Sequence, residues 1–129
     1  MKETINPVGW FEIYVENIDR ARRFYETVLD REMFDLPMSE DLEDMKMVVF
    51  PMLDDAPNSS GALVEMRGVE PGGNSTIVYF SSDDCEIEQS RVEAAGGKIL
   101  KPKFSIGDYG FISLVEDTEG NCIGLHSLK

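Results

Sequence analysis

The chain has 129 residues, of which 42% are hydrophobic, and this is enough for one domain with its own hydrophobic core. Its 25 acidic and 12 basic residues give a formal net charge of −13. That charge argues against binding to nucleic acid or to an anionic membrane, since both require a basic surface, and it favours cationic or neutral ligands.

Cys85 and Cys122 are the two cysteines of the chain, and their spacing matches neither a metal-binding motif nor a disulfide framework. We therefore interpret both as packing residues. No apolar run of the sequence approaches the length of a membrane span. We expect a cytoplasmic protein that binds a small molecule and has no nucleic-acid or membrane partner.

The first half of the chain opens with a predicted strand at 8–15. Alternation along this strand places apolar side chains on one face and those of Trp10, Glu12 and Tyr14 on the other. The spacing of apolar residues then predicts an amphipathic helix at 16–29. Three further extended segments are predicted at 32–36, 45–52 and 61–66.

The second half repeats this order after a polar segment at 67–75 that contains a proline and two adjacent glycines. The elements predicted there are a strand at 76–82, a helix at 83–97 and strands at 97–104, 110–117 and 121–128. Residues 117–121 are typical of a hairpin turn. The repeated order βαβββ indicates two copies of one supersecondary unit.

Three segments carry a resemblance to a known family: VGWFEIYVENIDRARRFYETVL, VEAAGGKIL and YGFISLVEDTEGNCIGLHS. In this order, and on this repeat, the chain resembles the vicinal-oxygen-chelate superfamily of glyoxalase I, bleomycin resistance proteins and extradiol dioxygenases. The resemblance implies an α+β fold in which two βαβββ modules form a curled mixed sheet, as half-barrels, around a pocket. We expect one domain at 1–129, with module one at 7–66, a linker at 67–75 and module two at 76–129.

Metal-dependent members of that family hold their ion near the start of each module's first strand and on each module's last strand. The resemblance places these positions at Trp10, Glu65, Thr76 and Gly124. Glu65 alone among them is a good ligand for a divalent metal, whereas zinc and iron sites usually use about three His, Cys or carboxylate ligands. We therefore expect no cofactor, with a divalent metal in a displaced site as the alternative.

Strand alternation extends the predicted pocket beyond those four positions. Glu12 interrupts an apolar strand, which suits a pocket carboxylate that acts as a general base or anchors a cation; a solvent-facing position is the alternative. His126 is the single histidine and is either a proton shuttle or a hydrogen-bonded structural residue. The predicted ligand-binding residues are Trp10, Glu12, Tyr14, Glu65, Thr76 and His126, with Glu12 and His126 as the catalytic candidates.

Three functions follow from these observations. The first is a metal-independent binding protein, similar to bleomycin resistance proteins, that holds a small cationic or aromatic molecule in an acidic pocket. The second is a lyase, isomerase or dioxygenase-type enzyme with a displaced metal or acid/base site at Glu12, Glu65 and His126. The third is a regulatory module with a vestigial pocket. The missing ligands favour the first, and the resemblance implies a symmetric homodimer, with modules paired within or between chains.

Overall fold

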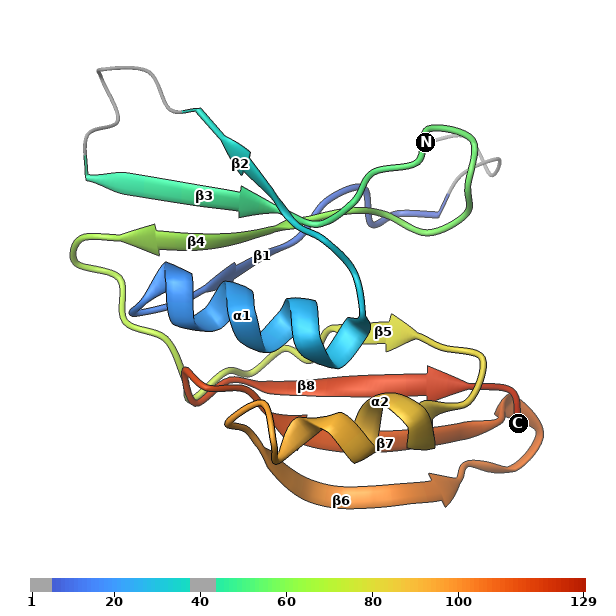
Figure 1. Cartoon of the computed structure of the whole chain (residues 1–129). Coiled ribbons are helices and arrows are strands. Elements are labelled where there is room, and N and C mark those ends of the chain that lie inside the picture. Colours follow the sequence, from blue (N-terminus) through green and yellow to red (C-terminus); the bar gives the residue numbers. More distant parts are fainter. Residues whose placement is uncertain (1–5, 38–43) are drawn as a thin grey trace.

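The computed structural model describes residues 6–37 and 44–129, and it contains the predicted repeat (Figure 1). Module one consists of β1 (Glu12–Tyr14), α1 (Ile18–Leu29), β2 (Phe34–Leu36), β3 (Met45–Val49) and β4 (Ala62–Met66). Module two consists of β5 (Tyr79–Ser81), α2 (Cys85–Val92), β6 (Lys98–Ser105), a 3-10 turn (Gly107–Tyr109), β7 (Phe111–Glu116) and β8 (Cys122–Ser127). The two modules therefore have the same element order.

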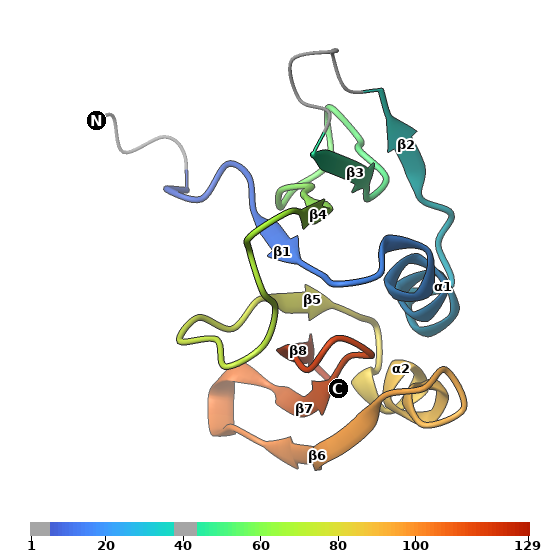
Figure 2. The ribbon, with the colours of Figure 1, turned by 90° about the vertical axis from the view of Figure 1, so that its left-hand side faces the viewer.

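Each module forms one four-stranded mixed sheet with the same topology. The strand orders are β1-β4-β3-β2 and β5-β8-β7-β6, in which the first and last strands of each module pair in parallel and the other pairs are antiparallel. Helices α1 and α2 lie side by side on one side of the two sheets, which leaves the opposite faces uncovered by helices (Figure 2). The α+β fold with two modules is confirmed, and the two sheets do not close into a barrel.

Helix α1 forms where the sequence predicts it, because its apolar residues recur on one face. That face is buried and consists of Ile18, Ala21, Phe24, Tyr25 and Val28. The helix begins after Asn17, whose side chain accepts a hydrogen bond from the backbone N–H of Arg20 at 3.0 Å. It ends at Asp30, which has left-handed backbone angles with a φ of 53°. Among the described residues, no helix is long and apolar enough to cross a membrane.

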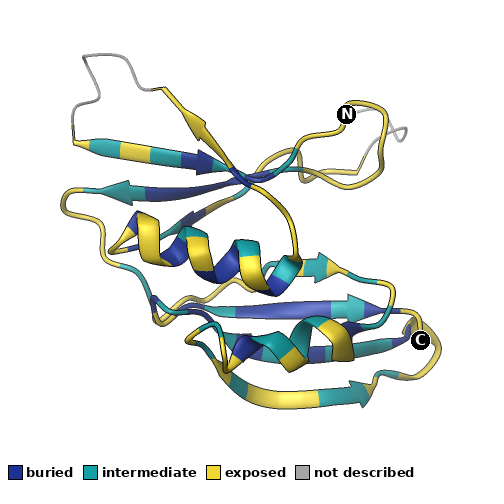
Figure 3. Cartoon of the chain, viewed as in Figure 1, coloured by how far each residue is buried: buried dark blue, intermediate teal, exposed yellow. Residues whose placement is uncertain are grey.

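The hydrophobic core lies between the helices and the sheets, and it is shared by both modules (Figure 3). An aromatic cluster joins the two halves. The ring of Phe80, from module two, has its centroid 5.4 Å from that of Phe50 and 5.9 Å from those of Phe11 and Tyr25. These separations are typical of favourable aromatic pairs. The modules are therefore packed together as parts of one core.

Some observed elements are shorter than the predicted ones. Strand β1 covers three of the eight residues predicted at 8–15, and α2 ends at Val92 rather than at 97. The chain turns sharply after α2, where Gly96 has a φ of 100° and the Gly97 N–H donates to the Val92 carbonyl at 2.9 Å. A Cβ atom at Gly97 would lie 2.4 Å from the Glu116 carbonyl oxygen. This close approach to β7 requires a glycine there.

Candidate functional site

The open face of β1 carries a carboxylate held between two aromatic side chains. The indole N–H of Trp10 donates to one oxygen of Glu12 at 3.3 Å, and the phenol of Tyr14 donates to the other at 3.0 Å. Trp10 is 40% exposed and Glu12 is exposed, whereas Ile13 and Val15 on the opposite face are buried. The predicted division of the strand into two faces is confirmed, and Glu12 is both ordered by its neighbours and accessible to a ligand.

The hydrogen bond between Tyr14 and Glu12 also changes the acidity of the phenol. The pKa of Tyr14 is raised, first by this hydrogen bond, then by partial burial and by the negative charge of Glu12. Tyr14 therefore stays protonated and keeps donating to Glu12 at neutral pH. A carboxylate beside a partly exposed indole ring is an arrangement that suits an organic cation.

Apolar side chains continue this open face across the rest of the first sheet. The β1–β4 register pairs Glu12 with Ala62 and Tyr14 with Val64. The remaining residues paired into the same face from β2, β3 and β4 are Phe34, Leu36, Met45, Met47, Val49 and Met66. Phe34 and Leu36 are 54% and 43% exposed. Large apolar groups that remain accessible on a sheet face often mark a binding surface.

Glu65 does not belong to this open face. It follows Val64 on β4, so its side chain points toward α1, where one of its oxygens accepts a hydrogen bond from the Ile18 N–H at 2.9 Å. Its other oxygen lies 3.7 Å from the Lys46 Nζ atom. A carboxylate at a helix N-terminus is stabilised by the free N–H groups there. Glu65 is therefore a helix cap on the face opposite Glu12.

The four expected family ligand positions are not equivalent in the two modules. When the two modules are aligned at their helix caps, Asn17 and Asp84, Tyr79 takes the position of Glu12. The strand pair Tyr79–Gly124 is then equivalent to the strand pair Glu12–Ala62. By this register the counterparts of Gly124 and Trp10 are Ala62 and Ile77, not Glu65 and Thr76. None of these four equivalent side chains, at Trp10, Ala62, Ile77 and Gly124, is a metal ligand.

The second sheet presents an aromatic ring and the histidine on its open face. The ring of Tyr79 lies directly on Gly124, where an added Cβ atom would come within 2.2 Å of the Tyr79 Cδ1 atom. His126, two residues further along β8, has its Nε2 atom 2.7 Å from the carbonyl oxygen of Tyr109. Because a carbonyl can only accept, Nε2 carries the proton in this contact. His126 is thus tied to the turn before β7, as its structural interpretation predicts.

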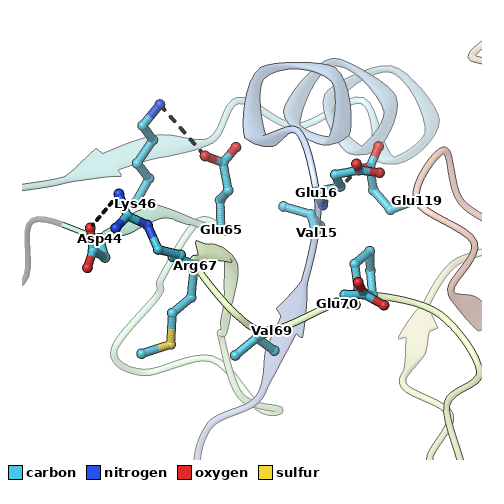
Figure 4. A pocket seen from close by; sticks show the side chains of 11 residues that line it. Val15, Glu16, Asp44, Lys46, Glu65, Arg67, Val69, Glu70 and Glu119 are labelled. Atoms are coloured by element: carbon cyan, nitrogen blue, oxygen red, sulfur yellow. Dashed lines mark hydrogen bonds and ion pairs between the residues drawn. The ribbon is translucent and has the colours of Figure 1, made fainter.

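Two cavities flank the linker residues 69–71. The smaller, about 250 Å³, is lined by Glu12 and Tyr14 of β1 and by Thr76 and Cys122 from module two. The larger, about 620 Å³, lies at the N-terminal end of α1 and is lined by Glu65 (Figure 4). The structure therefore brings Glu12, Tyr14 and Thr76 to one cavity.

The other predicted site residues lie apart from that cavity. Trp10 and His126 lie on open faces outside its lining, and Glu65 lies at the other cavity. Glu12, Glu65 and His126 do not form one catalytic group. In the described parts of the chain, no three His, Cys, Asp or Glu side chains gather in a way that could hold a metal ion. The residues present do not fit the metal site of metal-dependent family members.

A buried polar network next to the smaller cavity was not predicted from the sequence. The phenol of Tyr25 donates to Asp117 at 2.6 Å, and the other oxygen of Asp117 accepts from the backbone N–H groups of Glu119 and Asn121 at 2.8 Å. The Asn121 side chain donates to the Tyr14 carbonyl at 3.0 Å. Burial, followed by the charge and hydrogen bond of Asp117, raises the pKa of Tyr25 well above its ordinary value. The network fixes β1 against module two.

Glu119 anchors the same turn to the start of α1. It accepts hydrogen bonds from the backbone N–H groups of Glu16 and Asn17, both at 3.0 Å, and from the Arg20 guanidinium at 2.7 and 3.0 Å. Burial alone would raise its pKa, but Arg20, the two N–H groups and the Thr118 hydroxyl outweigh burial and lower the pKa to about 2. The sequence analysis identified residues 117–121 only as a turn. The two acidic residues in this turn, directly after an apolar strand, were the feature that could have indicated a buried polar network.

Comparisons with known proteins agree with this architecture. A family model described as "Glyoxalase/Bleomycin resistance protein/Dioxygenase superfamily" matches residues 7–125. A Mycobacterium tuberculosis protein named "Putative glyoxylase CFP32" is 25% identical over 119 residues, which are 91% of this chain and 44% of the relative. The chain thus spans less than half the length of the curated relatives it matches.

Solved structures with similar folds include both longer and equally long proteins. Glyoxalase I from Zea mays superposes with a TM-score of 0.75 at 21% identity, over 94% of this chain and 46% of that one. TnmS3, an antibiotic binding protein from Streptomyces sp. CB03234, gives a TM-score of 0.71 at 21% identity over 99% and 100% of the two chains. A glyoxalase/bleomycin resistance protein from Albidiferax ferrireducens T118 gives 0.67 at 16% identity over 93% and 98%. Since the family model spans nearly the whole two-module chain, this protein belongs to the glyoxalase/bleomycin resistance protein/dioxygenase superfamily.

Proposed function

We propose that this protein binds a small molecule with a cationic aromatic group on the open face of β1, without a metal at the family ligand positions. The observation that carries this proposal is the Glu12 carboxylate held between Trp10 and Tyr14. The indole ring offers a face for stacking or for a cation, and the carboxylate supplies the opposite charge. The cavity of about 250 Å³ beside Glu12 receives the part of the ligand that reaches toward module two.

Three further observations support this function. The apolar face of β2, β3 and β4 continues from Glu12, and an apolar surface with a few polar groups is typical of small-molecule sites. The net charge of −13 also favours the approach of a cation. TnmS3, which shares the fold over its whole length, is named an antibiotic binding protein. As part of the proposal, this chain is also a small-molecule binding protein, with a ligand of its own.

The enzyme alternative has less support from the geometry. A displaced acid/base or metal site at Glu12, Glu65 and His126 requires these side chains to converge, whereas Glu65 faces α1 and His126 bonds the Tyr109 carbonyl on the other sheet. The regulatory alternative requires a pocket too small for a ligand. The open face and its adjacent cavity favour binding over that alternative.

The proposal includes a symmetric homodimer. One chain leaves two sheet faces without a helix over them (Figure 2). Trp10, Ile77 and Tyr79 are 40%, 39% and 46% exposed. A second copy would cover part of this surface and enclose a ligand, in agreement with the two-fold symmetry of most small oligomers. Light scattering at micromolar concentration should give the mass of two chains. A monomer mass over the whole concentration range would remove this part of the proposal.

The binding test uses melting temperature as its readout, because a ligand that prefers the native state raises it. Benzyltrimethylammonium is the cationic aromatic probe, and phenylacetate is an anionic control of similar size. We expect the cation to raise the melting temperature of the wild type and of Glu93→Gln, an exposed control. Glu12→Gln, which keeps the side-chain shape, should lose most of the shift. Equal shifts in both variants, or a larger shift with phenylacetate, would reject a cation site at Glu12.

A further inference from the structure

The larger cavity is a separate feature from the proposed ligand site. It has a volume of about 620 Å³ and lies where β1 leads into α1, between the ends of β3 and β4 and the linker (Figure 4). Trp10, Glu12 and Tyr14 do not line it. Its volume is within the range of small-molecule sites, which is about 300–1,000 Å³.

The charged side chains of this cavity form two walls. The basic wall holds Lys46 and Arg67 together with their ion-pair partners Glu65 and Asp44, the acidic wall holds Glu16 and Glu70, and the side chain of Val69 lies between the two walls (Figure 4). The other apolar residues that line the cavity are Val15, Met66 and Pro71. A ligand that spans the cavity therefore meets two exposed ion pairs, then hydrocarbon, then the carboxylates of the acidic wall.

The basic wall is available to an incoming anion. Lys46 Nζ lies 3.7 Å from Glu65 and Arg67 lies 3.3 Å from Asp44, and the two basic side chains are 69% and 81% exposed. Ion pairs this exposed contribute little, typically about 0–1 kcal/mol. A carboxylate on a ligand can replace or join these partners without breaking a buried contact.

The acidic wall contains two carboxylates that the protein leaves accessible. Glu119, which also lines the cavity, is already bonded to Arg20 and to two backbone N–H groups. Glu16 and Glu70 are exposed, and within the described residues no ion pair of 4.0 Å or less involves either side chain. An ammonium group placed at this wall would give each of them a partner.

We propose that this cavity is a second binding site, for a flexible zwitterion with an amine and a carboxylate at opposite ends of a short aliphatic chain. The carboxylate lies at Lys46 and Arg67, the amine at Glu16 and Glu70, and the methylene chain on Val15 and Val69. A simple anion would meet repulsion from the acidic wall, and a simple cation would gain nothing from Lys46 and Arg67. The separated charges thus select a molecule that carries both.

The test measures binding of ε-aminohexanoate by amide NMR spectra of the isotopically labelled protein. Hexylamine and hexanoate, each with one of the two charges, are the matched single-charge probes. We expect saturable shifts at the backbone amides of Glu16 and Arg67, with no saturable shift at Tyr79 or Gly124 on the open face of module two. Shifts confined to the open face, or hexylamine binding as tightly as ε-aminohexanoate, would overturn the proposal.

Charge-removing variants locate the two ends of the probe. Glu70→Gln should weaken ε-aminohexanoate roughly two- to fivefold, the range expected for one partly exposed charge contact. Arg67→Gln should weaken it by a similar factor, while Arg23→Gln and Glu93→Gln, exposed sites remote from the cavity lining, should leave it unchanged. Unchanged affinity in both cavity variants would reject the assignment.

A last variant separates this site from the proposed function. Glu12→Gln should abolish the response to benzyltrimethylammonium and leave ε-aminohexanoate binding at wild-type strength, because Glu12 lines only the smaller cavity. If ε-aminohexanoate binding also disappears in Glu12→Gln, the two probes share one site and the second site does not exist. If the wild type binds ε-aminohexanoate but not benzyltrimethylammonium, the proposed function is wrong and the second site is supported.

Discussion

Replacing Glu119 with glutamine removes one negative charge from the contact between the 117–121 turn and α1. The side chain of Glu119 is fully buried and bonds to Arg20. Its pKa is lowered from 4.5 to about 2. At about 1.36 kcal/mol per pKa unit, this lowering corresponds to roughly 3 kcal/mol of stability from the ionised form. Glu119→Gln should therefore lower the free energy of unfolding at neutral pH by an amount of this order.

The pH dependence follows from the direction of the shift. Because the folded-state pKa is lower than the unfolded one, the contribution of Glu119 is fully present above about pH 4.5 and is lost as the pH falls toward about 2. The stability difference between wild type and Glu119→Gln should shrink over that range. Exposed carboxylates titrate in both proteins and cancel in the comparison.

Urea denaturation at a series of pH values measures this difference, since urea, unlike guanidinium, does not screen charges. Glu93→Gln provides the control for loss of an exposed carboxylate and should stay within about 0.5 kcal/mol of wild type. A deficit for Glu119→Gln that is the same at about pH 3 and about pH 7 would refute the reasoning. The stability would then come from side-chain shape and not from the ionised carboxylate.

Three further predictions concern single contacts. Tyr25→Phe removes the 2.6 Å hydrogen bond to Asp117 and should cost about 1–2 kcal/mol in urea denaturation, because Asp117 keeps its other donors; no loss would mean that the network is not formed in solution. Gly124→Ala should lower the free energy of unfolding by about 1–3 kcal/mol, because the added methyl group displaces the Tyr79 ring. In a double-mutant cycle, adding Tyr79→Ala should recover most of this loss, and additive effects of the two substitutions would contradict the contact. Asp30→Gly should raise the melting temperature, because glycine adopts left-handed backbone angles without the steric cost of about 1 kcal/mol that a side chain brings. A lower melting temperature would contradict the φ of 53° at this residue.

Local patterns in the sequence determined the element order and the repeat. The apolar face of α1 and the two faces of β1 were predictable because neighbouring residues set helical and strand periodicity. Element ends were less predictable. Helix α2 stops at Val92, and Gly97 then passes close to β7, a contact between segments that are about twenty residues apart along the chain.

The candidate site also has a part that local sequence patterns predicted and a part that depended on the tertiary structure. Trp10, Glu12 and Tyr14 share a face because they alternate on one strand, so the sequence alone placed them together. Glu65 could not be placed without the β1–β4 register, since a shift of one residue moves a side chain to the other face of a sheet.

Only the tertiary structure decided the role of residues 117–121. A turn sequence fixes the local backbone, but not which distant groups its side chains meet. In the folded chain, Glu119 meets the N-terminal end of α1 and Asn121 meets β1, 102 and 107 residues away in sequence. Asn121 also meets the linker, 49 residues away. These buried polar groups are stable only because the two modules bring their partners to them, and that pairing is a property of the whole fold.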